Sequence, residues 1–469
     1  TIKKIPALLG EVDLVRAIQL LPGVSTVGEG ASGFNVRGGG VDQNLVLLDD
    51  APVYNSSHLF GFFSVFNPDA VKDVKLYKGG IPAQYGGRAS SILDVKMKEG
   101  NAKKLEINGG IGVIFSRLSI EAPIVKDKAS FILAARRSYI DVLAKPFLTG
   151  NNANAAFNFY DLTAKVNYTI NSKNTVFLSG YFGRDVFGTG FGFNWGNSTT
   201  SARWNHVFSN KLFMNTTAFY SNYDYLLDSD LENKKPNDSF KWSSNIVNLS
   251  IKPDFTYYIQ PDNTLSFGGQ IISYEFKPGK ATATSGGEKR EFGQANKKGV
   301  ESSAYLGHDW KISPLFSVQY GIRYSYYDYK SLNGEYYDRI KVPESTENPS
   351  GYALKINTVN PETTVASYGN WEPRFALNMK VGANSSLKAS YNRLAQYVHL
   401  MSNTAASTPL DVWTTSTNNI KPQLVDQVAF GYFKNWGLDG NNYETSIEVY
   451  YKDMQNQIDY ADRSNLFLN

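Results

Sequence analysis

The clearest pattern along the chain is a strict alternation of apolar and polar residues that begins near residue 105. In the segment 315–328, every second side chain from Phe316 to Tyr326 is apolar or aromatic, and the residues between them are polar or small. The segment 443–452 repeats the pattern, with Glu444, Ser446, Glu448 and Lys452 on its polar face. A period of two predicts β-strands with one apolar face. The apolar faces of the two segments hold Phe316, Val318, Tyr320, Ile322, Tyr324 and Tyr326, and Tyr443, Thr445, Ile447, Val449 and Tyr451.

The connections between the predicted strands alternate between short and long. Short connections fall at 125–128, 171–174, 260–263 and 382–385, and long ones at about 140–159, 185–199, 277–300, 329–368 and 398–423. Transmembrane barrels have tight turns at one rim and long loops at the other, whereas a soluble β-sandwich, the alternative, has no such regular asymmetry. We therefore expect a transmembrane antiparallel β-barrel in residues 104–469. About fifteen strands are expected here, and since filled barrels run to about 22 strands, further strands are expected beyond Asn469.

Residues 1–103 follow a different pattern and are expected to form a separate α/β domain. Apolar residues at helical spacing predict a helix over 8–21 that Pro22 and Gly23 end. A second, short helix is expected at 68–72, and short strands at 34–37, 45–48, 74–77 and 93–98. The boundary between the two domains is expected near residues 99–101.

Composition agrees with a barrel and excludes some other classes. Aromatic residues make up 14% of the chain, the mean hydropathy is −0.33, and no run of eighteen apolar residues is present, which excludes a membrane protein built from helices. The net charge of +4 is spread along the chain without a basic run, so we expect no nucleic-acid partner. The first residues lack the apolar core of a signal peptide, and Thr1 is expected to lie inside a longer chain.

Three motifs that could indicate chemistry have simpler interpretations. The glycine pattern at 28–33 matches a dinucleotide-binding motif, but a helix precedes it and a strand follows, the reverse of what that site needs. Asp49 and Asp50 end a strand before Ala51-Pro52, so a turn is expected. The four histidines have no partner at metal-ligand spacing. We expect no metal, no cofactor and no enzyme activity.

Three sequence pieces resemble the plug domain of TonB-dependent outer-membrane transporters. They are the runs at 34–40 (FNVRGGG), 45–53 (LVLLDDAPV) and 74–88 (VKLYKGGIPAQYGGR), in this order. The segments 369–375, 390–393 and 421–431 resemble later barrel strands of the same family. The resemblance implies a barrel of about 22 strands when complete, with the N-terminal α/β plug domain in its lumen.

The resemblance also implies how the plug is held. In this family two plug arginines are bound by barrel glutamates, which suggests Arg37 and Arg88 with Glu448 and also Glu444. Glycines beside both arginines let the backbone approach the wall closely, and a guanidinium matches carboxylates in a lumen of low dielectric. The alternative is that each of these side chains faces water in the lumen.

Two segments are candidates for ligand contact. The plug loop 54–63 corresponds to a loop that faces the outer vestibule in the family. The aromatic and glycine-rich run 187–195 suits either a mobile lid that stacks on a ligand or an aromatic girdle at the membrane interface. The ligand-binding candidates are Tyr54, Asn55, His58, Phe60, Phe191 and Trp195.

The resemblance implies a function in the outer membrane of a bacterium. We expect TonB-dependent, ligand-gated import of a scarce nutrient such as a siderophore, vitamin, oligosaccharide or peptide. The expected partners are the TonB complex, bound through a segment upstream of residue 1, the ligand, outer-membrane lipid and accessory outer-membrane proteins. A lipoprotein lid of the glycan-importing subclass is not assumed. The alternative is a plugged barrel that serves as a structural or assembly subunit without transport.

Overall fold

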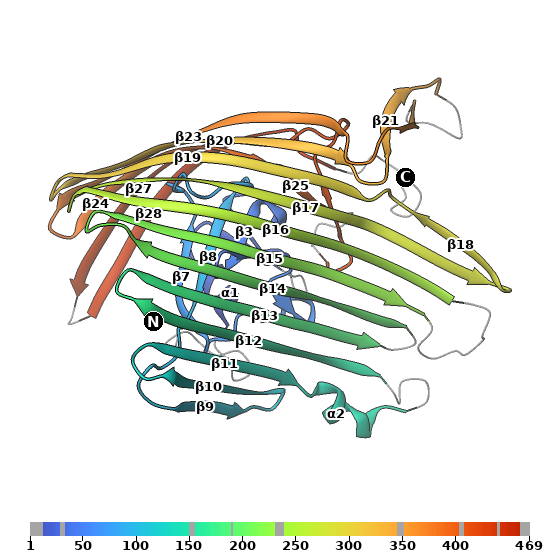
Figure 1. Ribbon diagram of the computed structural model, residues 1–469, viewed down its shortest axis with the longest axis horizontal. Helices are drawn as coiled ribbons and strands as arrows, with labels where there is room; N and C mark the ends of the chain where they lie inside the picture. The colour runs from blue at the N-terminus through green and yellow to red at the C-terminus, as the bar shows by residue number, and fades with distance from the viewer. Residues whose placement is uncertain are drawn as a thin grey trace.

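The computed structural model describes residues 13–28, 33–149, 155–188, 191–229, 239–344, 351–402, 408–438 and 441–459. Figure 1 shows two parts: an N-terminal domain and a long wall of strands that curves around it. The predicted helix at 8–21 and the glycine motif at 28–33 lie partly outside the described residues.

The N-terminal domain is built around a four-stranded sheet in the order β4-β3-β8-β7. The central strand β8 has buried residues at six of its seven positions because neighbours cover both of its faces, and it runs parallel to β3 and antiparallel to β7. The apolar core of the domain holds Phe34, Val36, Leu93 and Val95. The strands of the domain are β1 (Val24–Thr26), β2 (Phe34–Val36), β3 (Asn44–Leu48), β4 (Ala51–Pro52), β5 (Ser57–His58), β6 (Phe63–Ser64), β7 (Val71–Tyr77) and β8 (Ser91–Met97), with short 3-10 turns η2 (Val41–Gln43) and η3 (Leu59–Gly61).

The domain has one described α-helix, α1 (Leu14–Gln19), and the second expected helix is absent. Asp13 caps α1 by accepting a hydrogen bond from the Arg16 amide. The prediction of a helix at 68–72 was wrong. Asn67 accepts hydrogen bonds there from the amides of Asp69 and Ala70, which closes a turn, and β7 begins at Val71.

The wall is a sixteen-stranded sheet in which fifteen strands follow one another as neighbours and β18 pairs only with β17. The expectation of about fifteen strands is therefore confirmed. Strands β9 and β28 are the two ends of this order in the described part of the chain. The wall strands are β9 (Glu106–Ile111), β10 (Phe115–Val125), β11 (Ala129–Ser138), β12 (Ala156–Asn171), β13 (Asn174–Gly188), β14 (Gly192–Val207), β15 (Leu212–Asp228), β16 (Ser239–Gln260), β17 (Asn263–Ser285), β18 (Glu288–Gly293), β19 (Lys297–Ser313), β20 (Phe316–Ser331), β23 (Thr364–Gly382), β24 (Ser385–Gln396), β27 (Gln423–Leu438) and β28 (Asn441–Gln455).

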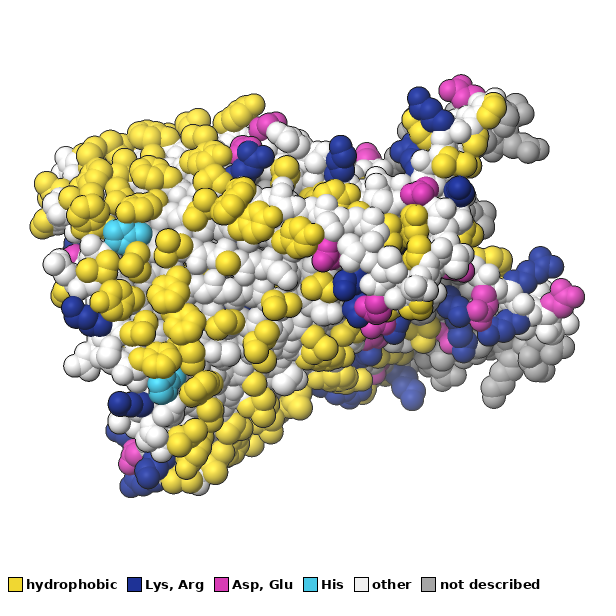
Figure 2. Space-filling model, turned by 45° about the horizontal axis from the view of Figure 1, so that its top comes forward, with side chains coloured by type: hydrophobic (Ala, Val, Ile, Leu, Met, Phe, Trp, Pro, Cys, Tyr) yellow, Lys and Arg dark blue, Asp and Glu magenta, His cyan; other side chains and the backbone are white. Residues whose placement is uncertain are grey.

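The faces of the wall strands follow the predicted alternation. On β20 the outward residue Tyr320 is 45% exposed, while the inward residues Arg323 and Ser325 are buried against the interior; on β28 Val449 is 66% exposed. Figure 2 shows hydrophobic side chains spread over the outer surface of the wall and charged side chains mainly toward its two ends. The outward face is thus apolar, as strands that meet lipid require. Among the described residues no helix is long and apolar enough to cross a membrane.

The two rims of the wall differ, also as predicted. Turns such as 171–174, 260–263 and 382–385 join strands at one rim. The other rim carries additional elements, which are α2 (Ile140–Ala144), η4 (Lys145–Phe147), β18, the hairpin β21 (Glu335–Lys341) and β22 (Tyr352–Thr358), and the pair β25 (Val398–Met401) and β26 (Val412–Thr415). We call this the loop rim. The expected long loop at 185–199 is wrong, because β13 and β14 pair out to Gly188 and Gly192.

Candidate functional site at the contact between the N-terminal domain and the wall

Arg37, Lys78 and Glu448 form an ionic contact, which we call the latch. It lies near the rim where short turns join the strands, the turn rim. Arg37 Nη2 lies 2.6 Å from Glu448 Oε2, and Lys78 Nζ lies 3.1 Å from Glu448 Oε1. Arg37 also donates to the Lys78 carbonyl at 3.0 Å, so the two cations of the domain share one carboxylate of β28. The Glu448 side chain is 17% exposed, and solvent therefore reaches this pair.

A glycine beside the latch leaves room for the Arg37 guanidinium. A Cβ atom at Gly79 would lie 2.7 Å from Arg37 Nη1, too close for any other residue without a shift of the guanidinium. This explains why a glycine follows Lys78 where the chain passes closest to the wall. Gln427 of β27 also donates to the Lys78 carbonyl at 2.9 Å, and Lys452 of β28 donates to Ser90 Oγ at 2.9 Å.

The structure places the other two residues of the expected anchor elsewhere. Arg88 is buried, donates to the Gly87 carbonyl at 2.9 Å, and lies over the rings of Tyr54 and Trp413 at 5.9 and 5.7 Å from their centroids. Glu444 is exposed on β28. Only one of the four suggested pairings, Arg37 with Glu448, is among the ion pairs of the described residues.

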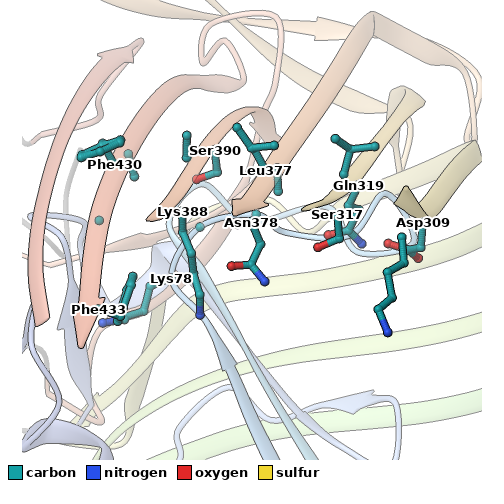
Figure 3. Close-up of a pocket in the computed structure, with 18 of the residues that line it drawn as sticks. Lys78, Asp309, Ser317, Gln319, Leu377, Asn378, Lys388, Ser390, Phe430 and Phe433 are labelled. Carbon is teal, nitrogen blue, oxygen red and sulfur yellow. The ribbon is translucent and has the colours of Figure 1, made fainter. Parts of the chain in front are cut away.

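A cavity of about 720 Å³ lies beside the latch, between β7 and the wall from β19 to β28. Figure 3 shows Lys78 and Lys388 pointing into it, with Asn378 and Gln319 further along the wall. The N-terminal domain therefore does not pack tightly against this side of the wall near the turn rim.

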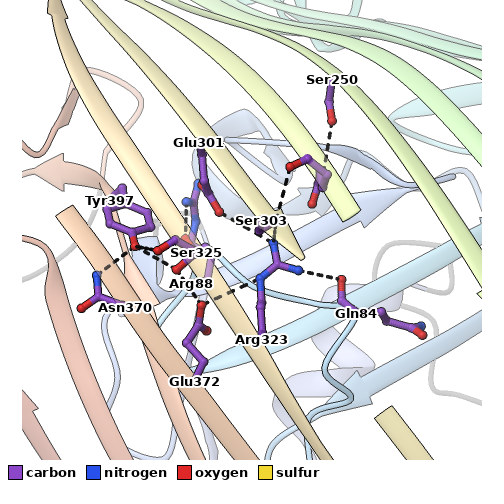
Figure 4. Close-up of polar contacts among 12 residues, drawn as sticks. Gln84, Arg88, Ser250, Glu301, Ser303, Arg323, Ser325, Asn370, Glu372 and Tyr397 are labelled. Carbon is purple, nitrogen blue, oxygen red and sulfur yellow. Dashed lines mark hydrogen bonds and ion pairs between the residues drawn. The ribbon is translucent and has the colours of Figure 1, made fainter. Parts of the chain in front are cut away.

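A buried charge network lies on β19, β20 and β23 (Figure 4). Arg323 lies between Glu301 and Glu372, 3.8 Å from each carboxylate, and donates to the Gln84 carbonyl of the N-terminal domain at 3.4 Å. Arg374 pairs with Glu372 at 2.9 Å and donates to the Pro82 carbonyl at 2.5 Å. The wall thus holds the segment 82–87 by donating to its backbone carbonyls, a contact that does not depend on the side chains of that segment.

Asp49 and Asp50 form the predicted turn between β3 and β4 and also bind the wall. Both have positive φ, 47° and 75°. Asp49 Oδ2 lies 2.9 Å from Lys165 Nζ of β12, and Arg203 of β14 is within 3.8 Å of both carboxylates. Asp50 also pairs with Lys96 at 2.6 Å. Burial opposes ionisation of Asp50, but Lys96 and Arg203 outweigh it and hold the pKa of Asp50 below its usual range. The turn was predicted from the sequence, but its ion pairs with the wall were not.

A fully buried ionic contact is a cluster of His58, Arg136, Asp161 and Asp185, which we call the clamp. His58 Nδ1 lies 2.7 Å from Asp185 Oδ2 and His58 Nε2 lies 3.2 Å from Asp161 Oδ2, and each of these side chains is at most 2% exposed. Arg136 binds Asp161 through Nε and Nη2 at 2.9 and 2.6 Å and donates to the Ser64 carbonyl. Asp185 also accepts from the Leu59 amide at 2.7 Å.

The surroundings of His58 favour its charged form. Burial by itself lowers the pKa of His58, but the carboxylates of Asp185 and Asp161 outweigh that effect and raise the pKa to about 9. The ring also stacks on Phe159 at 4.4 Å between centroids, and Tyr181 Oη lies 3.2 Å from Nε2. At neutral pH the N-terminal domain is therefore held to β11, β12 and β13 by a buried cation.

Of the ligand-binding candidates, Tyr54, Asn55, Phe60 and Trp195 lie at the contact between the loop 54–63 and β14, whereas His58 belongs to the clamp and Phe191 packs on Phe187. Asn197 donates to the Asn55 carbonyl at 2.7 Å and accepts from the Tyr54 amide, and Phe60 lies 4.8 Å from Trp195 between ring centroids. Tyr54, Asn55, His58 and Trp195 are buried, whereas Phe60 is half-buried and Phe191 is 40% exposed. Of the run 187–195, the residues up to Gly188 and from Gly192 belong to the paired strands β13 and β14. No group of metal-ligating side chains occurs among the described residues.

Comparisons with known proteins agree with this architecture. A model described as the TonB-dependent receptor plug domain matches residues 3–91, and one described as the TonB-dependent receptor-like β-barrel matches residues 130–468. No curated protein sequence matches the chain significantly.

Several solved structures share the fold at low sequence identity. The copper transporter OprC is 12% identical with a TM-score of 0.63 over 91% of this chain and 66% of that one. A mutant ferric enterobactin receptor, PfeA, of Pseudomonas aeruginosa is 12% identical with a TM-score of 0.63 over 95% and 69%. The siderophore receptor PirA of Acinetobacter baumannii is 14% identical with a TM-score of 0.62 over 95% and 68%. The chain spans about two thirds of the length of these structures.

Proposed function

We propose that this chain, which belongs to the family of TonB-dependent receptors, imports a scarce nutrient across the bacterial outer membrane through a ligand-gated, TonB-driven opening. The N-terminal domain is the plug and the wall is the barrel. Members of this family are transporters and receptors, not enzymes. The nutrient class stays open among siderophores, vitamins, oligosaccharides and peptides, and the TonB complex would bind upstream of residue 1.

The observation that carries this proposal is how the plug is held. Its contacts with the barrel include many ion pairs and hydrogen bonds, several of them to plug backbone carbonyls, such as those from Arg323, Arg374, Gln427 and Lys452. Apolar contacts are confined to separate clusters, such as the one that packs Phe63 against Phe115 and Phe159. Polar contacts of this kind can be exchanged for water, whereas a continuous apolar interface would have to be exposed as a whole. The polar part of this contact can therefore be released into water, and only the separate apolar clusters would have to be exposed when the plug moves.

We propose that the movement occurs on the latch side. The latch is partly exposed and borders the 720 Å³ cavity, so water and a solute have room there as soon as Arg37 and Lys78 release Glu448. The clamp is dry and its residues are at most 2% exposed, so releasing His58 would leave Asp185 buried without a cation and Asp161 with Arg136 alone, which is costly. The plug would therefore turn about the clamp and open at β20–β28.

Ligand contact is proposed for Phe60 and Phe191, which the closed arrangement leaves accessible. Tyr54, Asn55, His58 and Trp195 are buried and would meet a ligand only after the loop 54–63 has moved. Their contacts with Asn197 and Asp185 instead connect that loop to the wall, so a ligand that displaces Phe60 would act directly on the barrel contact.

Uptake by cells tests the proposal. Cells with and without the full-length protein, each with and without working TonB, are grown in a mixture of iron chelates, cobalamin, oligosaccharides and peptides, and depletion of the medium is followed by mass spectrometry. We expect at least one compound to be depleted only when both the protein and TonB are present. If no depletion depends on the protein, or if it does not depend on TonB, the alternative of a structural or assembly subunit is favoured.

A further inference from the structure

A second cavity, of about 500 Å³, lies at the loop rim. All of the additional strands of that rim contribute to it: Phe292 on β18, Tyr337 on β21, Leu354 on β22, Met401 on β25 and Val412 on β26. No residue of the plug is among those that line it. The volume lies within the range of small-molecule sites, which are typically about 300–1,000 Å³ and mostly apolar with a few polar groups.

The cavity has a buried floor and an accessible edge. Trp242, Tyr329 and Val412 in the floor are at most 4% exposed, whereas Phe292 is 39% and Leu354 is 57% exposed. Gly279 packs directly on Trp242, since a Cβ there would lie 2.7 Å from the indole ring. Flat aromatic surfaces therefore face a space that opens to the outside, an arrangement suited to stacking on a flat apolar group.

Lys297 supplies the one lysine or arginine side chain among the described residues that line this cavity. Its Nζ donates to Thr414 Oγ1 at 2.9 Å and is 3.3 Å from Gln294 Oε1. An ammonium group has three donors, so these two neutral acceptors leave one. Within the described ranges no carboxylate forms an ion pair with Lys297. Asp338, which lies behind the cavity residue Asn418, accepts hydrogen bonds from Asn418 and Asn357.

The next residue along the strand shows the contrast. Lys298 points to the other face of β19 and pairs with Glu362 at 2.8 Å. Lys298 therefore has a carboxylate as its partner, whereas Lys297, which faces the cavity, forms no ion pair with a carboxylate among the described residues. A cation lining an aromatic cavity without a counter-ion favours an anionic group from outside.

We propose that this cavity is the first binding site of the imported substrate, and that the substrate is an anion with a flat aromatic body whose acidic oxygen atoms meet Lys297. This inference rests on the import function proposed above. It names a substrate class and a site separate from the plug loop 54–63.

Binding of 2-naphthoate to the full-length protein in lipid nanodiscs tests the inference, with its neutral analogue 2-naphthamide as the comparison and empty nanodiscs as the blank. We expect naphthoate to bind the wild type about tenfold or more tightly than naphthamide, a ratio consistent with a charge-assisted hydrogen bond. Lys297→Gln should remove this preference, and Lys298→Gln, the matched control, should retain it. Phe292→Ala should weaken both compounds alike.

The outcomes separate this inference from the import function. Equal binding of the two compounds to the wild type, or a preference for naphthoate that survives Lys297→Gln, overturns the site even if TonB-dependent uptake of some nutrient is found. A preference that depends on Lys297, in a protein that supports no TonB-dependent uptake, leaves the site standing and overturns import. Folding of the Lys297→Gln variant is checked by electrophoresis. Since Lys297 is at the loop rim and not in the barrel core, the heat-dependent change in migration should be the same as in the wild type.

Discussion

The latch and the clamp attach the same plug to different parts of the same barrel, and they differ in their access to water. The latch pairs Arg37 and Lys78 with one carboxylate whose side chain is 17% exposed. In the clamp, His58 lies between two carboxylates, and Arg136 satisfies one of them, with every member at most 2% exposed. Arg37 in the latch is itself 7% exposed, so the contact at β28 is only partly open to water, whereas the one at β11–β13 is dry.

This difference suggests how one plug can be both retained and moved. Exposed ion pairs contribute about 0–1 kcal/mol, because water and salt compete for both charges. Removal of one partner from a buried pair costs about 3–5 kcal/mol, because the remaining charge cannot be hydrated. Force applied to the plug should therefore break the latch first.

Loss of the clamp cation should have the largest effect. His58→Gln leaves Asp185 without a cation and Asp161 with Arg136 alone, so we expect the free energy of unfolding to fall by about 3 kcal/mol at pH 7. The measurement is urea unfolding of the full-length protein in detergent. Lys72→Gln, which removes an exposed pair with Glu99 (56% and 44% exposed), should change it by less than about 0.5 kcal/mol. Equal effects of the two variants would remove the distinction between buried and exposed contacts.

The clamp should also make stability depend on pH in a defined direction. The pKa of His58 is about 9 in the folded protein and about 6.5 when unfolded. Its stabilisation is therefore fully present below about pH 6.5 and decreases as pH rises through 9. The difference between wild type and His58→Gln should shrink over that window. A difference that grows with pH would contradict a charged His58.

Loss of the latch carboxylate should cost little stability and change permeability instead. Glu448→Gln should lower the free energy of unfolding by about 1–2 kcal/mol, between the values for exposed and buried pairs, but raise passive uptake of large antibiotics by intact cells, because the plug then loosens beside the cavity. Glu444→Gln serves as the control. Glu444 lies four residues before Glu448 on the same face of the same strand, and its carboxylate is exposed. Permeability that rises equally in both variants would argue against the latch.

The smallest expected effect is that of salt, which should weaken the latch but not the clamp. Raising the ionic strength from 0.1 to 1 M shortens the Debye length from about 10 to 3 Å. The difference in unfolding free energy between wild type and Glu448→Gln should decrease by a few tenths of a kcal/mol, while that between wild type and His58→Gln should stay constant. If salt weakened the clamp as much as the latch, the clamp would not be dry.

The wall could be predicted from the sequence because its rule is local. An apolar medium outside and a polar plug inside impose a period of two on every strand, and this placed Tyr320 and Val449 on the outer face. The loop rim was less predictable: its long segments contain hairpins, and β13 and β14 extend where a loop was expected, because apolar and glycine-rich runs do not reveal where pairing ends.

The candidate site was predictable only where a resemblance supplied it. Arg37 with Glu448 came from the plug motifs. The clamp was missed because His58 and Asp185 are 127 residues apart, and the register that brings them together is a property of the whole barrel. A usable signal was present, since Arg136, Asp161 and Asp185 are charged residues at inward positions of three consecutive strands, β11, β12 and β13.

The central claim is that the plug opens at the latch and stays fixed at the clamp, and cysteine labelling tests it most directly. The chain has no cysteine, so Ser90→Cys beside Lys452 and Ser57→Cys beside His58 each introduce one thiol at a buried plug serine, 0% and 4% exposed. Maleimide labelling is measured in cells with and without working TonB, in the presence of the imported nutrient. We predict that TonB increases labelling of Ser90→Cys and leaves Ser57→Cys protected. TonB-dependent labelling of Ser57→Cys that equals or exceeds that of Ser90→Cys would contradict the claim.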